Sequence, residues 1–141
     1  MILIDTNVIS ELWKAEPDAG VLAWMDAQVV ATLYLSAITV AELRYGLAMM
    51  PEGRRRSIFE GRLEREVLPA FVGRILPFDL DESKAYATLM ARAKAEGRAI
   101  SQADGYIAAT ATVSTLMVAT RDVAPFQAAG LTVTNPWHTP S

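Results

Sequence analysis

Residues 2–12 set the fold class, and they read ILIDTNVISEL. The apolar run Ile2–Ile4 ends on the carboxylate of Asp5, a pattern that is typical of a buried strand in a parallel sheet. Apolar side chains then recur at helical spacing, at Val8, Ile9 and Leu12. Residues 6–14 are therefore expected to form a helix, so the chain opens with a strand that passes at once into a helix.

The same alternation of short apolar runs and helical patterns continues along the chain. Further strands are expected at residues 32–35, 74–78, 116–119 and 131–133. Further helices are expected at residues 21–25, 36–47, 51–69, 81–96 and 101–113. Strands that alternate with helices predict an α/β fold, here a single domain spanning residues 1–141 with a central, mostly parallel five-stranded sheet flanked by helices.

Composition excludes several classes of protein and of site. The 141 residues are 52% hydrophobic and 21% charged, which favours a packed core over disorder. The formal net charge of −3 argues against a strongly basic nucleic-acid footprint over the whole chain. There is no cysteine, and the single histidine is His138, so thiolate and multi-histidine chemistry are not expected. Apolar stretches fall short of the roughly 18 residues of a membrane helix, and we expect a soluble cytoplasmic protein.

Four carboxylates fall where the expected topology brings the chain to one edge of the sheet. Asp5 and Asp122 each follow a strand, at its carboxyl end. Asp104 lies in the first turn of the 101–113 helix, and Glu42 lies one to two turns into the helix that begins after Ser36. Sites in open parallel sheets lie at this edge.

Each of these acids also has a purely structural interpretation. Asp5 could cap the following helix, Asp104 could belong to a capping box that begins at Ser101, and Asp122 could be a turn residue. Glu42 could be an ordinary surface residue of a helix. Convergence favours function, because four carboxylates at one edge repel one another unless a cation lies between them. Without Cys or a His cluster, that cation is expected to be Mg²⁺ or Mn²⁺, which polarises phosphoryl oxygens and activates water.

Neighbouring polar residues could support such a site. Asn7 and Thr120 lie beside the expected ligands and could orient carboxylates or water. Arg121 is expected at the rim of the site, whereas the run Arg54–Arg56 is expected to be a solvated helix face.

At these residues the sequence resembles the PIN-domain ribonucleases, in the branch that contains VapC and FitB toxins. The resemblance spans the whole chain and rests on motifs in the family's order, at residues 2–12, 36–46, 103–111, 118–122 and 135–137. It implies a PIN-like fold and a Mg²⁺- or Mn²⁺-dependent endoribonuclease that is the toxin of a type II toxin–antitoxin pair. It further implies a homodimer, a small antitoxin partner, contact with DNA only through that antitoxin, and a 3′-hydroxyl leaving group.

The same resemblance assigns roles to particular residues. Asp5, Glu42, Asp104 and Asp122 are the implied metal-binding and catalytic acids. Apart from the resemblance, Arg121 and Arg44 are the expected substrate contacts. One position departs from the family pattern. Many relatives have Asn at the position of Asp122 and Asp at that of Pro125, whereas here the acid is at 122 and none is at 125.

Two other functions remain open at this stage. The chain could be a catalytically weak binding subunit that dimerises and joins its antitoxin in DNA-binding autoregulation. A phosphoacceptor receiver-like domain is less consistent with the sequence, because such a domain needs a pair of acids where Thr6 and Asn7 stand and a lysine where Arg121 stands.

Apolar residues on the helices around the first two strands are candidates for a partner surface. They are Leu12, Trp13, Trp24, Leu47, Met49 and Met50. Leu12 and Trp24 are expected in the core, whereas Trp13, Met49 and Met50 lie near helix ends and are the better interface candidates.

Overall fold

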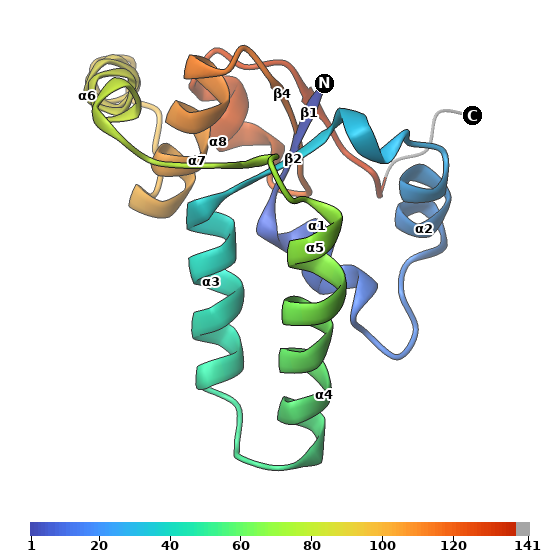
Figure 1. Ribbon diagram of the computed structural model, residues 1–141. Coiled ribbons are helices and arrows are strands. Elements are labelled where there is room, and N and C mark those ends of the chain that lie inside the picture. The colour runs from blue at the N-terminus through green and yellow to red at the C-terminus, as the bar shows by residue number, and fades with distance from the viewer. Residues whose placement is uncertain (138–141) are drawn as a thin grey trace.

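Five parallel strands form one sheet at the centre of the protein (Figure 1). The computed structural model describes residues 1–137. The strands are β1 (Ile2–Ile4), β2 (Leu33–Ser36), β3 (Ile75–Leu76), β4 (Met117–Ala119) and β5 (Val133–Thr134). Their order is β3-β2-β1-β4-β5, and every neighbouring pair is parallel. The expected α/β class and five-stranded parallel sheet are thus confirmed.

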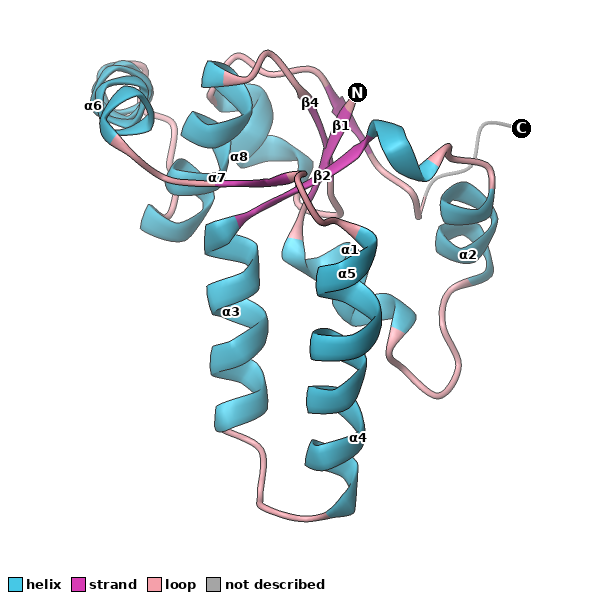
Figure 2. Cartoon of the chain, in the orientation of Figure 1, coloured by secondary structure: helices cyan, strands magenta, loops and turns pink. Residues whose placement is uncertain are grey.

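Helices cover both faces of this sheet (Figure 2). They are α1 (Thr6–Leu12), α2 (Ala19–Asp26), the 3₁₀ turn η1 (Val30–Thr32), α3 (Ala37–Ala48), α4 (Arg54–Arg62), the π-helical segment η2 (Leu63–Val67), α5 (Leu68–Ala70), α6 (Leu80–Ala95), α7 (Gln102–Val113) and α8 (Val123–Ala128). Within residues 1–137, no helix has both the length and the apolar character needed to cross a membrane.

The alternation of side chains along β1 separates two cores. Ile4 packs on one face with residues from α1, α2 and α3. Leu3 packs on the opposite face with residues from α6, α7 and α8, among them the fully buried Phe126. This two-sided burial explains why β1 is apolar at every position, and it places the carboxyl end of β1 between the two layers of helices.

Three expected elements differ from those observed. The expected strand at 131–133 is β5 at Val133–Thr134, and the expected strand at 74–78 is only β3. The single expected helix at 51–69 begins only at Arg54 and is π-helical over Leu63–Val67; Pro69, which has no N–H for the helical ladder, lies in the last short segment. Helix α8 was not expected, since it is short and contains Pro125, which a first helical turn tolerates.

Candidate functional site

A cavity of about 370 Å³ opens at the carboxyl edge of the sheet, and all four singled-out acids line it. Its lining residues are Asp5, Thr6, Asn7, Ser10, Glu11, Lys14, Glu42, Asp104, Arg121, Asp122 and Trp137. They come from the ends of β1 and β4, from α1, α3 and the first turn of α7, and from residue 137 near the end of the chain. The expected convergence of Asp5, Glu42, Asp104 and Asp122 is therefore what the structure shows.

Asp5 occupies the centre of this arrangement and is only 4% exposed. Its carboxylate accepts hydrogen bonds from the Thr6 backbone N–H at 2.8 Å and from the Thr120 hydroxyl at 2.8 Å, with the Asn7 amide farther away at 3.4 Å. Asp5 thus caps α1 and also faces the cavity, so the structural and functional interpretations both hold.

Burial raises the pKa of Asp5 from 3.8 to about 6. The hydrogen bonds from Thr120 and Thr6 oppose this rise, while the negative charges of Asp104 and Glu42 add to it. The carboxyl groups therefore affect one another electrostatically across the cavity.

Thr120 and Asn7 link the two strand ends. The Thr120 hydroxyl donates to Asp5 and accepts from the backbone N–H of Asp122 at 3.0 Å. The Asn7 amide nitrogen approaches the Thr120 hydroxyl at 3.3 Å, and its oxygen accepts from the Arg121 N–H at 3.3 Å. These contacts fix the loop that carries Asp122 relative to Asp5.

Glu42 is oriented by a hydroxyl that the sequence analysis did not select. The Thr6 hydroxyl donates to the Glu42 carboxylate at 2.6 Å. Behind it, the Thr39 hydroxyl lies 3.2 Å from that of Thr6 and 3.1 Å from that of Ser36. Ser36 also caps α3 through the Thr39 N–H, as its position after the expected strand at residues 32–35 indicated.

Asp104 faces the cavity from the first turn of α7. Ser101 caps this helix by accepting from the Asp104 N–H at 3.2 Å. Burial raises the pKa of the Asp104 carboxyl, a hydrogen bond with the Ser101 side chain opposes the rise, and the charge of Asp122 adds to it. The next residue, Gly105, lets α7 lie close to α6, because a Cβ there would come within 2.7 Å of the Met90 sulfur.

The donor set of this cavity suits a hard divalent cation. The acids supply oxygen ligands. Burial is the main reason that the pKa values of Asp5 and Asp104 are raised, and the charges of neighbouring acids add to the rise, so a bound cation would favour the ionised carboxylates. Within residues 1–137, no three His, Asp or Glu side chains form a ready-made metal cage. Mg²⁺ commonly binds through one or two carboxylates and retains several waters, so the pocket fits that mode of binding.

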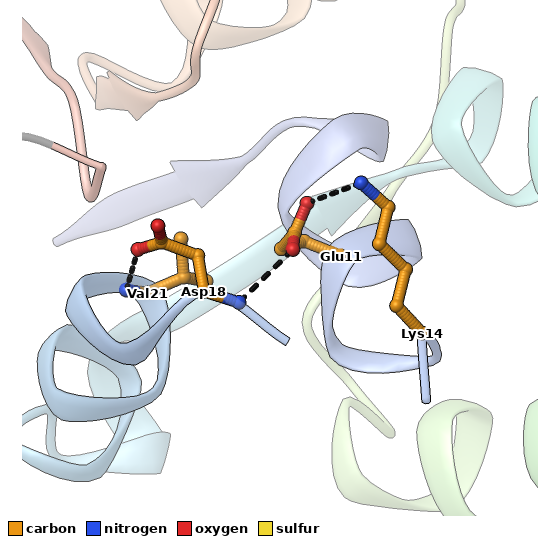
Figure 3. A network of polar contacts seen from close by, with 4 residues as sticks. All are labelled: Glu11, Lys14, Asp18 and Val21. Carbon is orange, nitrogen blue, oxygen red and sulfur yellow. Dashed lines mark hydrogen bonds and ion pairs between the residues drawn. The ribbon is translucent and has the colours of Figure 1, made fainter. Parts of the chain in front are cut away.

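Glu11 and Lys14, which also line the cavity, belong to a polar network (Figure 3). Glu11 is buried, and its carboxylate accepts from the Asp18 N–H at 3.0 Å and pairs with the Lys14 ammonium at 2.8 Å. The hydrogen bond from Lys14 is the main reason that the pKa of Glu11 lies below its usual range. Asp18 in turn caps α2 by accepting from the Val21 N–H, so the network ties α1 to α2.

Of the two expected substrate contacts, Arg121 and Arg44, only Arg121 lines the cavity. Arg121 lies at the cavity and its guanidinium sits 5.2 Å from the centre of the Trp137 ring. Arg44 does not line the cavity; it pairs with Glu64 across the α3–η2 contact at 2.5 Å. Sequence reasoning missed the roles of Thr6, Glu11, Lys14 and Trp137, although the first three follow Asp5 within nine residues. His138 lies outside the described residues.

The apolar residues proposed for a partner surface differ in how exposed they are. Met49 is 68% exposed, whereas Trp13 and Met50 are partly buried against the core that includes Leu43 and Leu47. Leu12 and Trp24 pack against the same core.

The fold and the site together define the class: an α/β protein whose parallel sheet is covered by helices on both faces. Its candidate active site is a cavity lined by four acids at the carboxyl edge of that sheet. Comparison with known proteins narrows this class: the PIN domain family matches residues 2–130. The chain belongs to the PIN-domain family, in the branch of VapC and FitB toxins.

Curated relatives match this chain over nearly its full length. The "VapC ribonuclease Y4jK" of Sinorhizobium fredii (strain NBRC 101917 / NGR234) is 70% identical over 137 residues, covering 97% of this chain and 98% of that protein. The "Toxin FitB" of Neisseria gonorrhoeae (strain ATCC 700825 / FA 1090) is 51% identical over 138 residues, covering 98% of this chain and 99% of that protein.

Solved structures share the same fold. The crystal structure of FitAcB from Neisseria gonorrhoeae matches with a TM-score of 0.96 and 51% identity, covering 99% of this chain and 100% of that chain. The structure of FitAB bound to an IR36 DNA fragment matches with a TM-score of 0.96 and 48% identity, covering 100% of this chain and 99% of that chain.

Proposed function

We propose that this protein is a Mg²⁺- or Mn²⁺-dependent endoribonuclease and the toxin of a type II toxin–antitoxin pair. The observation that carries the proposal is the meeting of Asp5, Glu42, Asp104 and Asp122 in one cavity at the sheet edge. The 70% identical relative named as a VapC ribonuclease supports the same activity. The single sheet and the family match over residues 2–130 support treating residues 1–141 as one domain.

Three acids are the proposed ligands of the ion. Asp5, Asp104 and Asp122 would hold it directly or through water, and a bound divalent ion would supply polarisation of a phosphoryl oxygen and a more acidic water. Glu42 is then available to accept a proton from the attacking water or to complete the ligand set. Thr6 fixes the direction of the Glu42 carboxylate, which limits the positions at which that proton can be accepted.

The other cavity residues orient the acids or carry charge toward the substrate. Asn7 and Thr120 hold Asp5 and the Asp122 loop in register. Arg121, at the mouth of the cavity, carries a positive charge that can pair with a phosphate next to the scissile one. Hydrolysis would leave a 3′-hydroxyl, as the family resemblance implies.

The proposed partners follow from the relatives. A cognate antitoxin would neutralise the protein, a homodimer is the proposed assembly, and DNA would be reached only through the antitoxin. The match to FitAB bound to a DNA fragment supports DNA binding by such a complex. Since the proposed substrate is cellular RNA, the cytoplasm is the proposed compartment.

The same DNA-bound relative favours one second function, a catalytically weak subunit that serves autoregulation with its antitoxin. Purified, antitoxin-free protein distinguishes the two functions. RNA should be cleaved with Mg²⁺ or Mn²⁺, spared in excess EDTA, and cleaved again when the metal is restored. The matched Asp104→Asn protein should be inactive throughout. Cleavage that survives complete chelation, or cleavage by neither protein, would refute the proposal.

A further inference from the structure

A groove leads away from the acidic cavity between α1 and α4. Next to the acidic cavity lies a hollow of about 220 Å³, which shares Ser10, Lys14 and Glu42 with it. Beyond that hollow lies a larger one of about 720 Å³ whose lining is Trp13, Lys14, Ala15, Arg54, Arg55, Ile58, Phe59 and Arg62. Lys14 lines all three, and the middle and outer hollows also share Trp13, Arg55 and Phe59, so the three adjoin one another and are together named here the α1–α4 groove.

The charge of the outer groove is opposite to that of the acidic cavity. Four cations line it and no carboxylate does. Across the described range 1–137, the ion pairs involve Lys14, Arg44 and Arg56, and none involves Arg54, Arg55 or Arg62. A chain with a net charge of −3 therefore concentrates unneutralised positive charge beside its acidic cavity. Such a patch attracts a polyanion.

An aromatic surface lies within these cations. The Trp13 and Phe59 rings are stacked, with centroids 5.8 Å apart and an angle of 22° between their planes. The guanidinium groups of Arg55 and Arg62 each lie 5.6 Å from the centre of the Phe59 ring. Both rings remain partly exposed. Cations interleaved with partly exposed aromatic rings are the surface on which unpaired bases stack while their phosphates are neutralised.

Lys14 is placed to connect the two regions. Its ammonium is held by Glu11 at 2.8 Å, which leaves two of its three N–H donors for other partners. Its side chain is 59% exposed, so it can reach a phosphate at the point where the acidic cavity opens into the groove.

We propose that the α1–α4 groove binds the single-stranded RNA that flanks the cleaved phosphodiester. Lys14 contacts the phosphate nearest the acidic cavity, Arg55 and Arg62 contact phosphates farther along, and the Trp13–Phe59 surface stacks a base. Because stacking on a side chain needs an unpaired base, the groove selects single strands over duplexes. This inference rests on the proposed nuclease function, since it names the substrate form that the same site accepts.

Binding of a labelled 12-nucleotide single-stranded RNA, followed by fluorescence anisotropy, tests the groove. The proteins carry Asp104→Asn and the buffer contains EDTA, so that the RNA stays intact. The test variant is Arg55→Gln/Arg62→Gln. The control is Lys94→Gln/Arg98→Gln, which removes the same charge from a separate hollow at the end of α6.

The expected result is a smaller salt dependence in the test variant. Each single-strand phosphate contact contributes about 0.7 to the slope of log Kd against log salt, so losing two lowers the slope by about 1.4. With equal binding at 1 M salt, this corresponds to about 25-fold weaker binding at 0.1 M. The control should bind like the parent protein, and a duplex of the same length should bind the parent less tightly.

Three results would overturn the inference. One is equal RNA affinity of the test variant and its parent, and another is an equal loss in the control variant. The third is unchanged RNA binding together with loss of the complex formed with the adjacent gene product, which would make the groove a protein-docking surface. These outcomes are separate from failure of the nuclease proposal, because binding is measured without cleavage.

Discussion

Replacing Asp5 by Asn should stabilise the metal-free protein near neutral pH. In the folded protein the pKa of Asp5 is about 6 against an ordinary value of 3.8. A difference of about two units corresponds to about 3 kcal/mol of folding free energy. Asn removes this charge penalty but loses part of the hydrogen bonding with Thr6 and Thr120, at a cost of about 1 kcal/mol. The net gain expected for Asp5→Asn at pH 7 is therefore about 2 kcal/mol.

The raised pKa of Asp5 makes the stability of the wild type fall with rising pH. Because the folded-state pKa of Asp5 is raised, the folded protein binds the proton more tightly than the unfolded chain does. The stability associated with the protonated form is complete below about pH 4, and it is lost as the pH rises through about 6. The wild type should lose this increment between those pH values, whereas Asp5→Asn should not.

Urea unfolding in EDTA at pH 4, 5, 6 and 7 measures the difference. Asp26→Asn, at an exposed position at the end of α2, is the matched control and should change stability by less than about 0.5 kcal/mol. The reasoning is refuted if Asp5→Asn is no more stable than wild type at pH 7. It is also refuted if the difference between the two proteins is the same at pH 4 and pH 7.

Three further substitutions probe the support of the site and its core. Thr120→Val removes a hydrogen-bond donor to Asp5, so it should raise the pKa of Asp5 further. It should also lower the free energy of unfolding by about 1–3 kcal/mol, measured by urea unfolding, and unchanged stability would contradict this. Thr6→Val should lower the rate of RNA cleavage roughly 10- to 100-fold, because it frees the Glu42 carboxylate, whereas Thr6→Ser should retain activity. Equal rates for the two variants would count against a role of the Thr6 hydroxyl in orienting Glu42. Phe126→Ala should cost about 3–5 kcal/mol in the same unfolding assay, because the ring is fully buried; a loss below 1 kcal/mol would be inconsistent with that packing.

The fold and the four acids could be predicted because local signals agreed with the global arrangement. The apolar run of β1 and the helical pattern after it indicated a strand covered on both faces. Because the strands were taken as parallel, the carboxyl ends of β1 and β4, with Asp5 and Asp122, were expected at one edge of the sheet. The direct pairing of β1 with β4 is a finding of the structure. The positions of Asp104 and Glu42 near helix starts completed the set.

Other features depend on tertiary contacts that a local pattern does not encode. The Thr6–Glu42 hydrogen bond joins residues 36 positions apart, and nothing in either segment alone indicates it. The role of Phe59 depends on Trp13 from another helix, and the run Arg54–Arg56 appeared only as a solvated face. Arg44 was expected to contact the substrate, but its partner Glu64 is set by how α3 packs against the segment after α4.

Anomalous scattering from Mn²⁺ tests the central claim most directly, because it locates the ion relative to the acids. Crystals of the antitoxin-free protein are grown with Mn²⁺, and data are collected on both sides of the manganese absorption edge. The account predicts an anomalous peak in the acidic cavity, within coordination distance of at least one of Asp5, Asp104 and Asp122, and no such peak in crystals of Asp104→Asn. Saturating Mn²⁺ that gives no peak there, or a peak only elsewhere, would contradict the claim that these carboxylates form a metal site.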